Sequence, residues 1–471
     1  MNASSTTLRA APKAMDTALL RRFDVPGPRY TSYPTADRFV EAFGAAEHAS
    51  ALQLRAGAKV AGGGPFSLYV HVPFCESVCY YCACNKVITR RHERAAPFLQ
   101  TLEAEMALNA SLLGSPQPVS QVHLGGGSPT FLDDGELQRL MQAVHKHFRI
   151  VPGAELSIEV DPRTVDAQRL QALRQLGFNR LSFGVQDFDA RVQQAVHRVQ
   201  PLESVAALMR SARALEFDSI NVDLIYGLPR QTQLSVATTI AQVIELQPDR
   251  IALYAYAHLP QRFKPQRRIH AADLPPPADR VAMLEGSVAQ FLDAGYVYIG
   301  MDHFARPGDA LAIAKRQGRL HRNFQGYSTQ PDCDLIGLGP SAISRIGATY
   351  SQNAKDLQGW HDAVTQGQFP VERGLALTRD DLLRRAVIMA LMCQGRVEFE
   401  SVELAHLVDM RRYFAEELDR LVPLAEAGLV DLGGDAIQVT PAGWYVVRAI
   451  AMVFDRHLQS DRLRERFSRV I

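Results

Sequence analysis

Four cysteines fall within ten residues, and they carry the strongest chemical signal in the chain. The run HVPFCESVCYYCACNK places Cys75, Cys79, Cys82 and Cys84 in the spacing C-x3-C-x2-C-x-C. Thiolates are soft ligands, and a cluster of them in a chain with few other cysteines indicates zinc or an iron–sulfur cluster. Structural zinc sites usually join two separate cysteine pairs, whereas all four sulfurs here belong to one short loop. The spacing therefore favours an iron–sulfur cluster.

Two arrangements of that cluster remain open. If Cys75, Cys79 and Cys82 are the only ligands, one iron keeps a free position where a small molecule can bind, and Cys84 belongs to the wall of the site. If Cys84 is a fourth ligand, the cluster is closed and serves as an electron carrier. We favour three ligands, which predicts that Cys84→Ala retains the cluster and that Cys82→Ala loses most of its iron.

Glycines and carboxylates follow later hydrophobic runs, where they could line a cofactor groove. VHLGGGSPT ends one run with Gly126, Gly127 and Ser128, and glycine lets backbone groups approach a ligand without interference from a Cβ atom. In LSIEVDPRT, Glu159 and Asp161 are two residues apart and so face the same side of a strand. A carboxylate in such a strand is costly to bury without a partner. We expect Glu159 to accept hydrogen bonds from a ligand and Asp161 to cap a turn.

Three further polar residues occupy comparable places later in the chain. Gln186 lies in SFGVQDF, Arg198 in AVHRVQ and Asp223 in INVDLIYGLP. In barrels of alternating strands and helices, ligand-binding residues gather at the carboxyl ends of the strands. For Asp223 the alternative is a buried structural acid paired with an arginine.

The elements that must position these residues form a repeating pattern. Short β-rich runs, separated by helix-patterned stretches, occupy residues 67–72, 120–124, 156–160, 180–185, 220–227 and 250–256. Strands alternating with helices predict an α/β fold with a parallel sheet. Six units are too few for an eight-fold barrel, so we expect a partial (β/α)6 barrel, with a doubly wound sheet as the alternative.

The flanking regions complete a division into four segments. Residues 1–60 hold a tail, the extended arm PGPRYTSYPTADRF and a helix around 40–58, and residues 61–300 hold the barrel. Residues 300–350 are rich in glycine, asparagine and polar aromatic residues, which predicts a poor core but a plausible wall for a site. We expect residues 301–372 to extend the barrel as this active-site wall. Residues 373–471 read as a helical, winged-helix-like domain with two short strands around a Gly433–Asp435 turn.

Composition excludes several functional classes. The chain has 471 residues with 51 Lys+Arg against 50 Asp+Glu, a formal charge of +1, which disfavours nucleic acid as a partner. It contains no apolar run of about 18 residues, so no membrane span is expected. Six cysteines are too few for a disulfide scaffold. We expect a cytoplasmic protein.

The C-x3-C-x2-C spacing, with Tyr81 before the third cysteine, resembles the signature of radical S-adenosylmethionine (SAM) enzymes. The resemblance implies a partial (β/α)6 barrel and one 4Fe–4S cluster bound by three cysteines. It also implies that the open iron is chelated by the amino and carboxylate groups of SAM. Reductive cleavage of SAM would then give methionine and a 5′-deoxyadenosyl radical.

A longer series of motifs is similar to one family within that superfamily. PRYTSYPTA, GGGSPT, IEVDPR, RLSFGVQDF, DLIYGLP, YAYAHLP, HRNFQGYSTQ and GPSAIS together resemble the oxygen-independent coproporphyrinogen III oxidases. The resemblance implies oxidative decarboxylation of the ring A and ring B propionates of coproporphyrinogen III to vinyls. The products would be protoporphyrinogen IX and carbon dioxide, in anaerobic haem biosynthesis.

The same resemblance implies roles for individual residues. Tyr69, His71 and Cys84 are implied to belong to the catalytic centre. Contacts to the SAM on the cluster are implied for Tyr69, Gly126, Glu159 and Ile343. Contacts to a second SAM are implied for Tyr81, Gly127, Ser128, Gln186, Arg198, Asp223 and Ala257. Ser128 stands where the family often has threonine, so the hydroxyl is kept.

The reaction also implies partners. An unidentified electron donor and an unidentified terminal electron acceptor are required, and a monomer is the family expectation. Because the substrate carries four carboxylates, cationic side chains should bind it; the candidates are Arg29, Lys264, Arg267, Arg268 and Arg322. We expect the arm to fold over the barrel mouth as a lid.

Three other functions are weaker alternatives. A haem-binding chaperone related to this family shares the three-cysteine motif, but such relatives lack the PRYTSYPT arm and the fourth cysteine. An electron-transfer module would need Cys84 as a ligand and would leave Gly126 and Glu159 unexplained. DNA binding by the carboxyl-terminal domain conflicts with its mixed charge.

Overall fold

A computed structural model describes residues 22–23, 25–57, 64–114, 116–330 and 333–459. The tail expected at the amino terminus lies outside these residues. The chain divides into two compact units. One comprises the described parts of Thr35–Pro276 and Gln330–Arg379, and the other those of Met1–Pro34, Pro277–Thr329 and Asp380–Ile471. No helix within the described ranges has the length and apolar character needed to cross a membrane.

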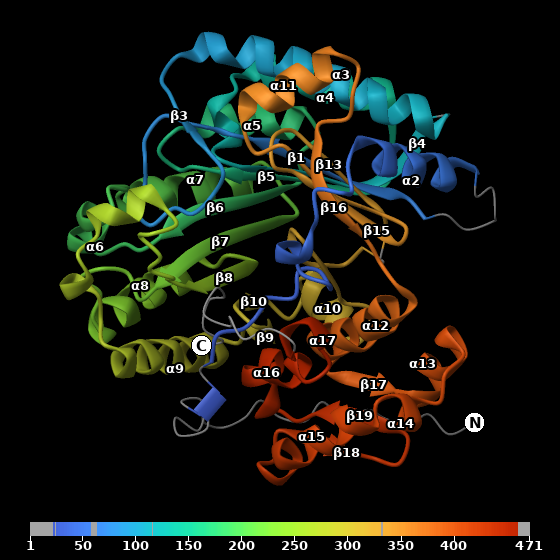
Figure 1. Ribbon diagram of the computed structural model, residues 1–471. Helices are drawn as coiled ribbons and strands as arrows, with labels where there is room; N and C mark the ends of the chain where they lie inside the picture. The colour runs from blue at the N-terminus through green and yellow to red at the C-terminus, as the bar shows by residue number, and fades with distance from the viewer. Residues whose placement is uncertain (1–21, 24, 58–63, 115, 331–332, 460–471) are drawn as a thin grey trace. The chain divides into compact units, whose positions relative to one another are not determined.

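The first unit is built around six parallel strands, as the sequence predicted (Figure 1). They are β1 (Phe66–Val72), β4 (Gln117–Gly126), β5 (Phe148–Val160), β6 (Arg180–Gln186), β7 (Ser219–Tyr226) and β8 (Arg250–Ala255). Each pairs in parallel with the next in this order. All six carboxyl ends therefore meet at one edge, where ligand-binding residues gather in such folds. The expected α/β fold with a parallel sheet is confirmed.

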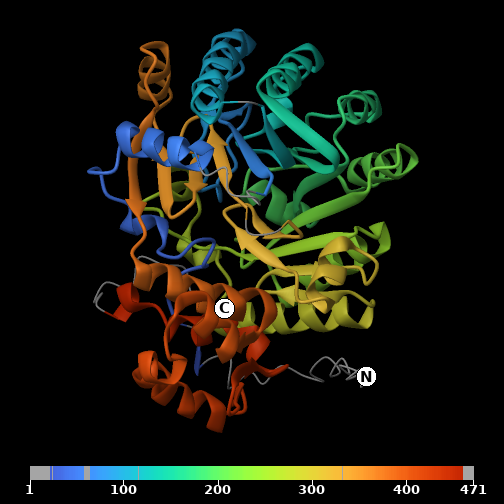
Figure 2. The same ribbon diagram turned by 90° about the vertical axis from the view of Figure 1, so that its right-hand side faces the viewer.

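Helices connect the strands and lie along their outer side, as the cyan-to-green helices in Figure 2 show. They are α3 (Ala95–Leu113), α4 (Asp134–His147), α5 (Ala167–Gln175), α6 (Ala190–Ala195), α7 (Leu202–Ala214) and α8 (Gln233–Leu246); the helix α2 (Ala45–Gly57), expected around 40–58, precedes β1. Capping residues in the local sequence determine where several of these helices begin. Asp133 and Glu136 form a capping box at the start of α4, because each side chain accepts from the backbone N–H of the other residue.

The expectation of a poor core in residues 300–350 is wrong from residue 335 onward. β13 (Leu335–Leu338) is buried at every position and pairs in parallel with β1. β14 (Ile343–Ile346), β15 (Thr349–Asn353) and β16 (Val371–Ala376) extend the sheet in antiparallel fashion, and α11 (Leu357–Thr365) precedes β16. These strands are short and glycines lie within or between them, so the sequence pattern did not indicate them. Gly337 in β13 allows β14 to lie close, because a Cβ at this position would lie 2.5 Å from the Ile343 carbonyl oxygen.

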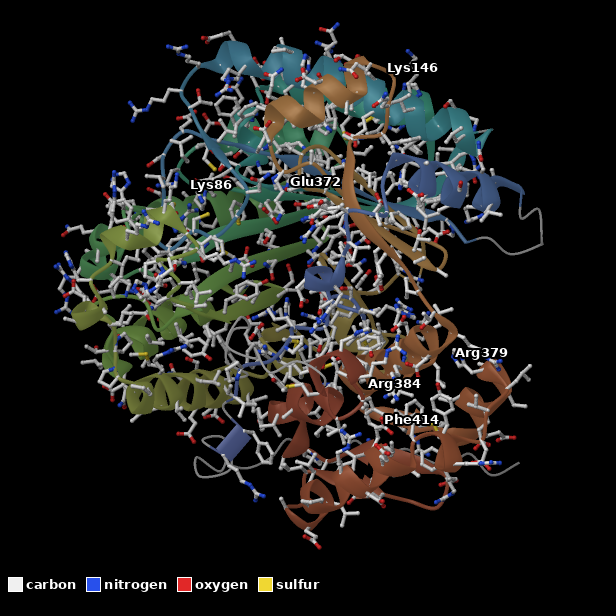
Figure 3. All side chains as sticks on the ribbon, viewed as in Figure 1. Lys86, Lys146, Glu372, Arg379, Arg384 and Phe414 are labelled. Atoms are coloured by element: carbon white, nitrogen blue, oxygen red, sulfur yellow. The ribbon has the colours of Figure 1, made fainter. Side chains whose placement is uncertain are left out.

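The second unit contains the carboxyl-terminal helices and the start of the arm. Its elements are α9 (Pro277–Asp293), β9 (Val297–Gly300), β10 (His303–Ala305), α10 (Ala310–Arg316), β11 (His321–Asn323), β12 (Gly326–Ser328), α12 (Arg379–Gln394), β17 (Arg396–Glu398), α13 (Phe399–His406), α14 (Met410–Tyr413), α15 (Ala415–Glu426), β18 (Val430–Leu432), β19 (Ala436–Val439), α16 (Val447–Met452) and α17 (Arg456–Gln459). The expected strands around Gly433–Asp435 are confirmed as β18 and β19, and β17 joins them. Arg384 packs over the ring of Phe414, 5.2 Å from its centroid (Figure 3).

The start of the arm packs into a hydrophobic core. Tyr30 and Tyr33 are fully buried in the core of the second unit. The Tyr30 hydroxyl donates to Asp455 at 3.0 Å, and Arg448 donates to the Pro28 carbonyl at 3.0 Å. The arm is therefore fixed at its start to the carboxyl-terminal helices.

Candidate cofactor site

The cysteine loop leaves the sheet at the carboxyl end of β1 and is closed at its base. β2 (Phe74–Cys75) and β3 (Val87–Ile88) pair in parallel. Val87 N–H donates to the Pro73 carbonyl at 2.7 Å, and Thr89 N–H donates to the Cys75 carbonyl at 2.9 Å. This clasp makes one compact loop of the residues between, so that all four thiols of the motif are held on one side of the sheet edge.

The thiols are close enough to influence one another. Burial raises the pKa of Cys75 to about 12, and charge on Cys82 and Cys79 adds to the rise. A hydrogen bond from the Cys84 thiol lowers the pKa of Cys82 to about 6. Lys86, labelled in Figure 3, donates to the carbonyls of Cys82 and Cys84 at 3.3 and 3.2 Å. A set of soft donors gathered in this way fits a thiolate-bound metal cluster.

Two arginines point at the sulfur of Cys79. Arg198 Nη1 lies 3.5 Å and Arg163 Nη2 3.7 Å from Cys79 Sγ. Both guanidiniums also donate to Asp161. Burial pushes the pKa of Asp161 up, but the hydrogen bonds from Arg163 and the charge of Arg198 outweigh it and lower the pKa. Asp161 caps a turn as expected, because its Oδ1 accepts from Arg163 N–H at 3.1 Å, and it is also an anion that holds two cations at the cysteine loop.

The glycine run forms a cradle that side chains would fill. Gly126 has φ of +115°, and a Cβ there would lie 2.6 Å from the imidazole of His71. A Cβ on Gly127 would lie 2.7 Å from the carbonyl oxygens of Pro73 and Phe74. Gly127 N–H donates to the Val72 carbonyl, which ties the cradle to the start of the cysteine loop. Glycine is therefore required here for backbone to lie against backbone.

Glu159 extends from β5 to that cradle. Its Oε2 accepts from Gly126 N–H at 3.1 Å, and its Oε1 lies 3.4 Å from His123 Nε2. Tyr69 stacks on His123 with ring centroids 5.9 Å apart, and its hydroxyl lies 3.1 Å from His71 Nδ1. Burial lowers the pKa of His71 and outweighs the hydrogen bond to the Asn85 carbonyl and the charge of Glu159, which act the other way. The carboxylate thus borders the cradle on one side and an aromatic stack on the other.

Asp223 stands two strands further along. It accepts from Ser182 Oγ at 2.9 Å and from Asn221 Nδ2 at 2.9 Å. Burial, with a smaller contribution from the charge of Glu159, raises its pKa to about 6. Gln186 ends β6 with φ of +69°, a left-handed conformation that asparagine or glycine adopts more readily. Such a conformation away from glycine is frequent at functional sites.

One cavity of about 370 Å³ brings most of the expected residues together. From the sequence-derived set it is lined by Cys75, Cys79, Tyr81, Cys82, Cys84, Gly126, Gly127, Ser128, Glu159, Gln186, Arg198 and Asp223. Tyr69 and His71 lie behind the cradle, while Ala257 and Ile343 are outside the lining. The lining also includes Lys86, Arg163 and Ser182, which sequence reasoning missed. In the sequence, only their position near an expected residue could have indicated that these three residues line the cavity.

The cationic candidates for the substrate lie elsewhere. Arg268 packs over the Tyr80 ring at 5.1 Å and donates to its hydroxyl, and Arg267 donates to the Pro260 carbonyl. In the second unit, Arg29 is ion-paired with Asp302, and Arg322 is buried over the ring of Tyr327. Neither these arginines nor Lys264 line the cavity that holds the cysteines.

Comparisons with known proteins agree with this geometry. Residues 69–243 match the radical SAM superfamily, and residues 377–446 match the HemN C-terminal domain. The chain is 49% identical to the oxygen-independent coproporphyrinogen III oxidase of Pseudomonas aeruginosa, covering 97% of this chain and 98% of that protein. It is 48% identical to that of Escherichia coli K12, with the same coverage. The solved E. coli structure, described as a radical SAM enzyme, covers 96% of this chain and all of its own, with a TM-score of 0.89 and 46% identity.

Proposed function

This chain belongs to the family of oxygen-independent coproporphyrinogen III oxidases, and we propose from that premise how its own residues serve the reaction. The enzyme oxidatively decarboxylates the ring A and ring B propionates of coproporphyrinogen III to vinyl groups. Protoporphyrinogen IX and carbon dioxide are formed without oxygen. The observation that carries the assignment is the single cavity in which the cysteine loop, the glycine cradle and Glu159 meet.

Cys75, Cys79 and Cys82 would hold one 4Fe–4S cluster. Together, the cluster and SAM supply an electron and a carbon radical strong enough to remove hydrogen from a propionate side chain. The protein itself positions the ligands and places positive charge beside the cluster. Arg163 and Arg198 donate to the Cys79 sulfur and would hold it in position as a ligand. Cys84 would remain a wall residue that hydrogen-bonds to the Cys82 sulfur.

The glycine cradle and Glu159 would bind the SAM that sits on the cluster. The carboxylate of Glu159 is already oriented by Gly126 N–H and offers its remaining lone pairs to an ammonium or to ribose hydroxyls. Tyr69 and His71 support this wall from behind, with the imidazole held between the Tyr69 hydroxyl and the Asn85 carbonyl. Ile343 is the fourth proposed contact, from the first position of β14.

A second SAM is proposed beside the first. Asp223 and Gln186 stand at adjacent strands and line the same cavity, together with Tyr81, Gly127, Ser128 and Arg198. Ala257 follows β8 and completes the proposed set. Equilibrium binding of labelled SAM to the reconstituted protein should give two molecules per cluster, and Asp223→Ala should reduce this to one. A single SAM in the wild-type protein contradicts the second site.

The remaining partners are also proposals. We propose a monomer that works in the cytoplasm, takes electrons from a separate donor and passes the substrate's electrons to a separate acceptor. Sedimentation of the reconstituted protein tests the first point, and fractionation of cells tests the second. The donor and acceptor can be found by adding purified redox proteins to the turnover assay.

The whole assignment is tested by turnover. The protein is reconstituted anaerobically with iron and sulfide, then supplied with reductant, SAM, coproporphyrinogen III and a cell extract as the source of the acceptor. Protoporphyrinogen IX should form with release of two carbon dioxide molecules per substrate. A protein with a full cluster that cleaves SAM but leaves coproporphyrinogen III unchanged would refute the substrate assignment.

A further inference from the structure

A carboxylate is buried outside the cavity, on the helix α3, and the reaction described above does not use it. Glu105 is 1% exposed. Its Oε2 accepts from Gly339 N–H at 2.8 Å and from Trp360 Nε1 at 2.9 Å, and its Oε1 accepts from Asn353 Nδ2 at 2.6 Å. Burial raises its pKa to about 7, while these three hydrogen bonds act against the rise. A buried carboxylate is costly unless it is hydrogen-bonded in this way.

Two of the three bonds reach the same turn between β13 and β14. Glu105 holds the N–H of Gly339 directly. Asn353 Nδ2, which donates to Glu105 Oε1, also donates to the Gly339 carbonyl at 2.9 Å. The turn is therefore tied to Glu105 at both its N–H and its C=O. The bond from Trp360 comes from α11 and does not touch the turn.

The turn lies directly against the wall of the cofactor site. Gly339 has φ of +93°, and a Cβ there would lie 2.6 Å from the His71 carbonyl oxygen. Four residues later the chain reaches Ile343, the proposed SAM contact. A second connection starts two residues after Asn353, where the Lys355 carbonyl accepts from Asn85 Nδ2 at 3.0 Å. The carbonyl of Asn85 is in turn the hydrogen-bond partner of His71 Nε2. Both routes from Glu105 therefore end at His71.

We propose that Glu105 is a positioning residue, which fixes the Gly339 turn against His71 and so sets the geometry of the SAM site. The inference rests on the proposed function. An apolar residue at this position would suit the interior of α3, whereas a carboxylate satisfies the N–H of Gly339 and orients the amide of Asn353 at the same time. The Gly339 N–H belongs to the turn after β13 and the Asn353 amide belongs to β15, so the carboxylate ties the turn to β15.

The test compares Glu105→Gln with Trp360→Phe. A glutamine amide can accept through only one oxygen, so its NH2 must face a donor, and at least one tie to the Gly339 turn is lost. Trp360→Phe removes a hydrogen bond from the same carboxylate but leaves both ties intact. Hydrogen exchange of the peptide spanning 337–344 is measured in the full-length protein without added SAM. After reconstitution, iron content and the SAM concentration for half-maximal 5′-deoxyadenosine formation are measured.

In Glu105→Gln we expect exchange at 337–344 at least about fivefold faster, wild-type iron content and about a tenfold higher half-saturating SAM concentration. Trp360→Phe should match the wild type in exchange and in SAM dependence. Unchanged SAM dependence in Glu105→Gln, or an equal change in Trp360→Phe, overturns the proposal. If Glu105→Gln does not fold, Asn353→Ser must show the same pattern. Wild-type protein that fails to cleave SAM would count against the proposed function, because the exchange comparison needs no cofactor.

Discussion

Arg198 Nη1 lies 3.5 Å from the sulfur of Cys79, while the same guanidinium holds Asp161 through both of its terminal nitrogens. A buried cation at a sulfur ligand stabilises the more negative, reduced form of an iron–sulfur cluster. Asp161 and Arg163 fix this cation in place, so its contact with Cys79 is part of the local fold.

Arg198→Gln should therefore lower the reduction potential of the cluster. Losing about 1 kcal/mol of charge-assisted hydrogen bonding corresponds to a shift on the order of 40 mV toward more negative values for a one-electron couple. A redox titration without SAM, followed by electron paramagnetic resonance (EPR), measures it. Arg191→Gln is the control, because Arg191 is an exposed arginine paired with Asp189. An unchanged potential in fully loaded Arg198→Gln contradicts this prediction.

The division of roles among the cysteines predicts two different outcomes on substitution. Cys82→Ala should lose most of its iron after anaerobic reconstitution, because three thiolates are needed to hold the cluster. Cys84→Ala should keep wild-type iron, since its thiol is proposed to hydrogen-bond to the Cys82 sulfur and not to ligate iron. Iron and sulfide analysis decides between them. Equal iron loss in both variants would mean that Cys84 is a ligand.

Gly126→Ala should damage the cradle. The new Cβ would lie 2.6 Å from the His71 ring at a φ of +115°, so we expect about 1–3 kcal/mol of destabilisation and at least tenfold weaker SAM binding. The control is Gly153→Ala, where φ is +76° but no atom lies within 4 Å of the new Cβ. That variant tests backbone strain alone and should bind SAM normally. Indistinguishable SAM affinity in the two variants would argue against the cradle.

Asp223 predicts a specific dependence of stability on pH. Its pKa of about 6 in the folded protein exceeds the ordinary value of 3.8, so the folded state holds a proton that the unfolded state releases. Stability should fall as the pH rises from about 4 to about 6 and then level off. Asp223→Asn lacks this loss and should gain about 1–2 kcal/mol relative to wild type across that range. Urea unfolding of cluster-free protein at several pH values measures the difference, and a constant difference would contradict the assignment.

The strands that alternate with helices could be predicted because each contains a run of buried or alternately buried apolar residues, although β5 extends over 13 residues and begins well before the expected residue 156. β13 could not, because Leu335–Leu338 is four residues long and is followed by Gly339 at a positive φ, so its sequence reads as a loop. Its place beside β1 depends on tertiary pairing between residues more than 250 positions apart, such as Tyr69 with Gly337. The local sequence does not encode such pairing.

For the site too, residues marked by the local sequence could be predicted, and those placed by tertiary contacts could not. Cys75, Gly126 and Glu159 could be identified because each lies at or just beyond a strand end, and the topology brings strand ends together. Arg163 was missed because nothing in IEVDPR distinguishes an arginine that reaches a sulfur from one that faces solvent. The haem-binding chaperone alternative is not favoured, because the coproporphyrinogen III oxidases match along nearly the full chain.

The most direct measurement is the EPR spectrum of the anaerobically reconstituted, reduced protein before and after SAM is added. An open iron held by Cys75, Cys79 and Cys82 predicts a cubane signal that changes on SAM binding, followed by the appearance of 5′-deoxyadenosine. Protein that contains zinc in place of iron, or a cubane whose signal is the same with and without SAM, would contradict the central claim.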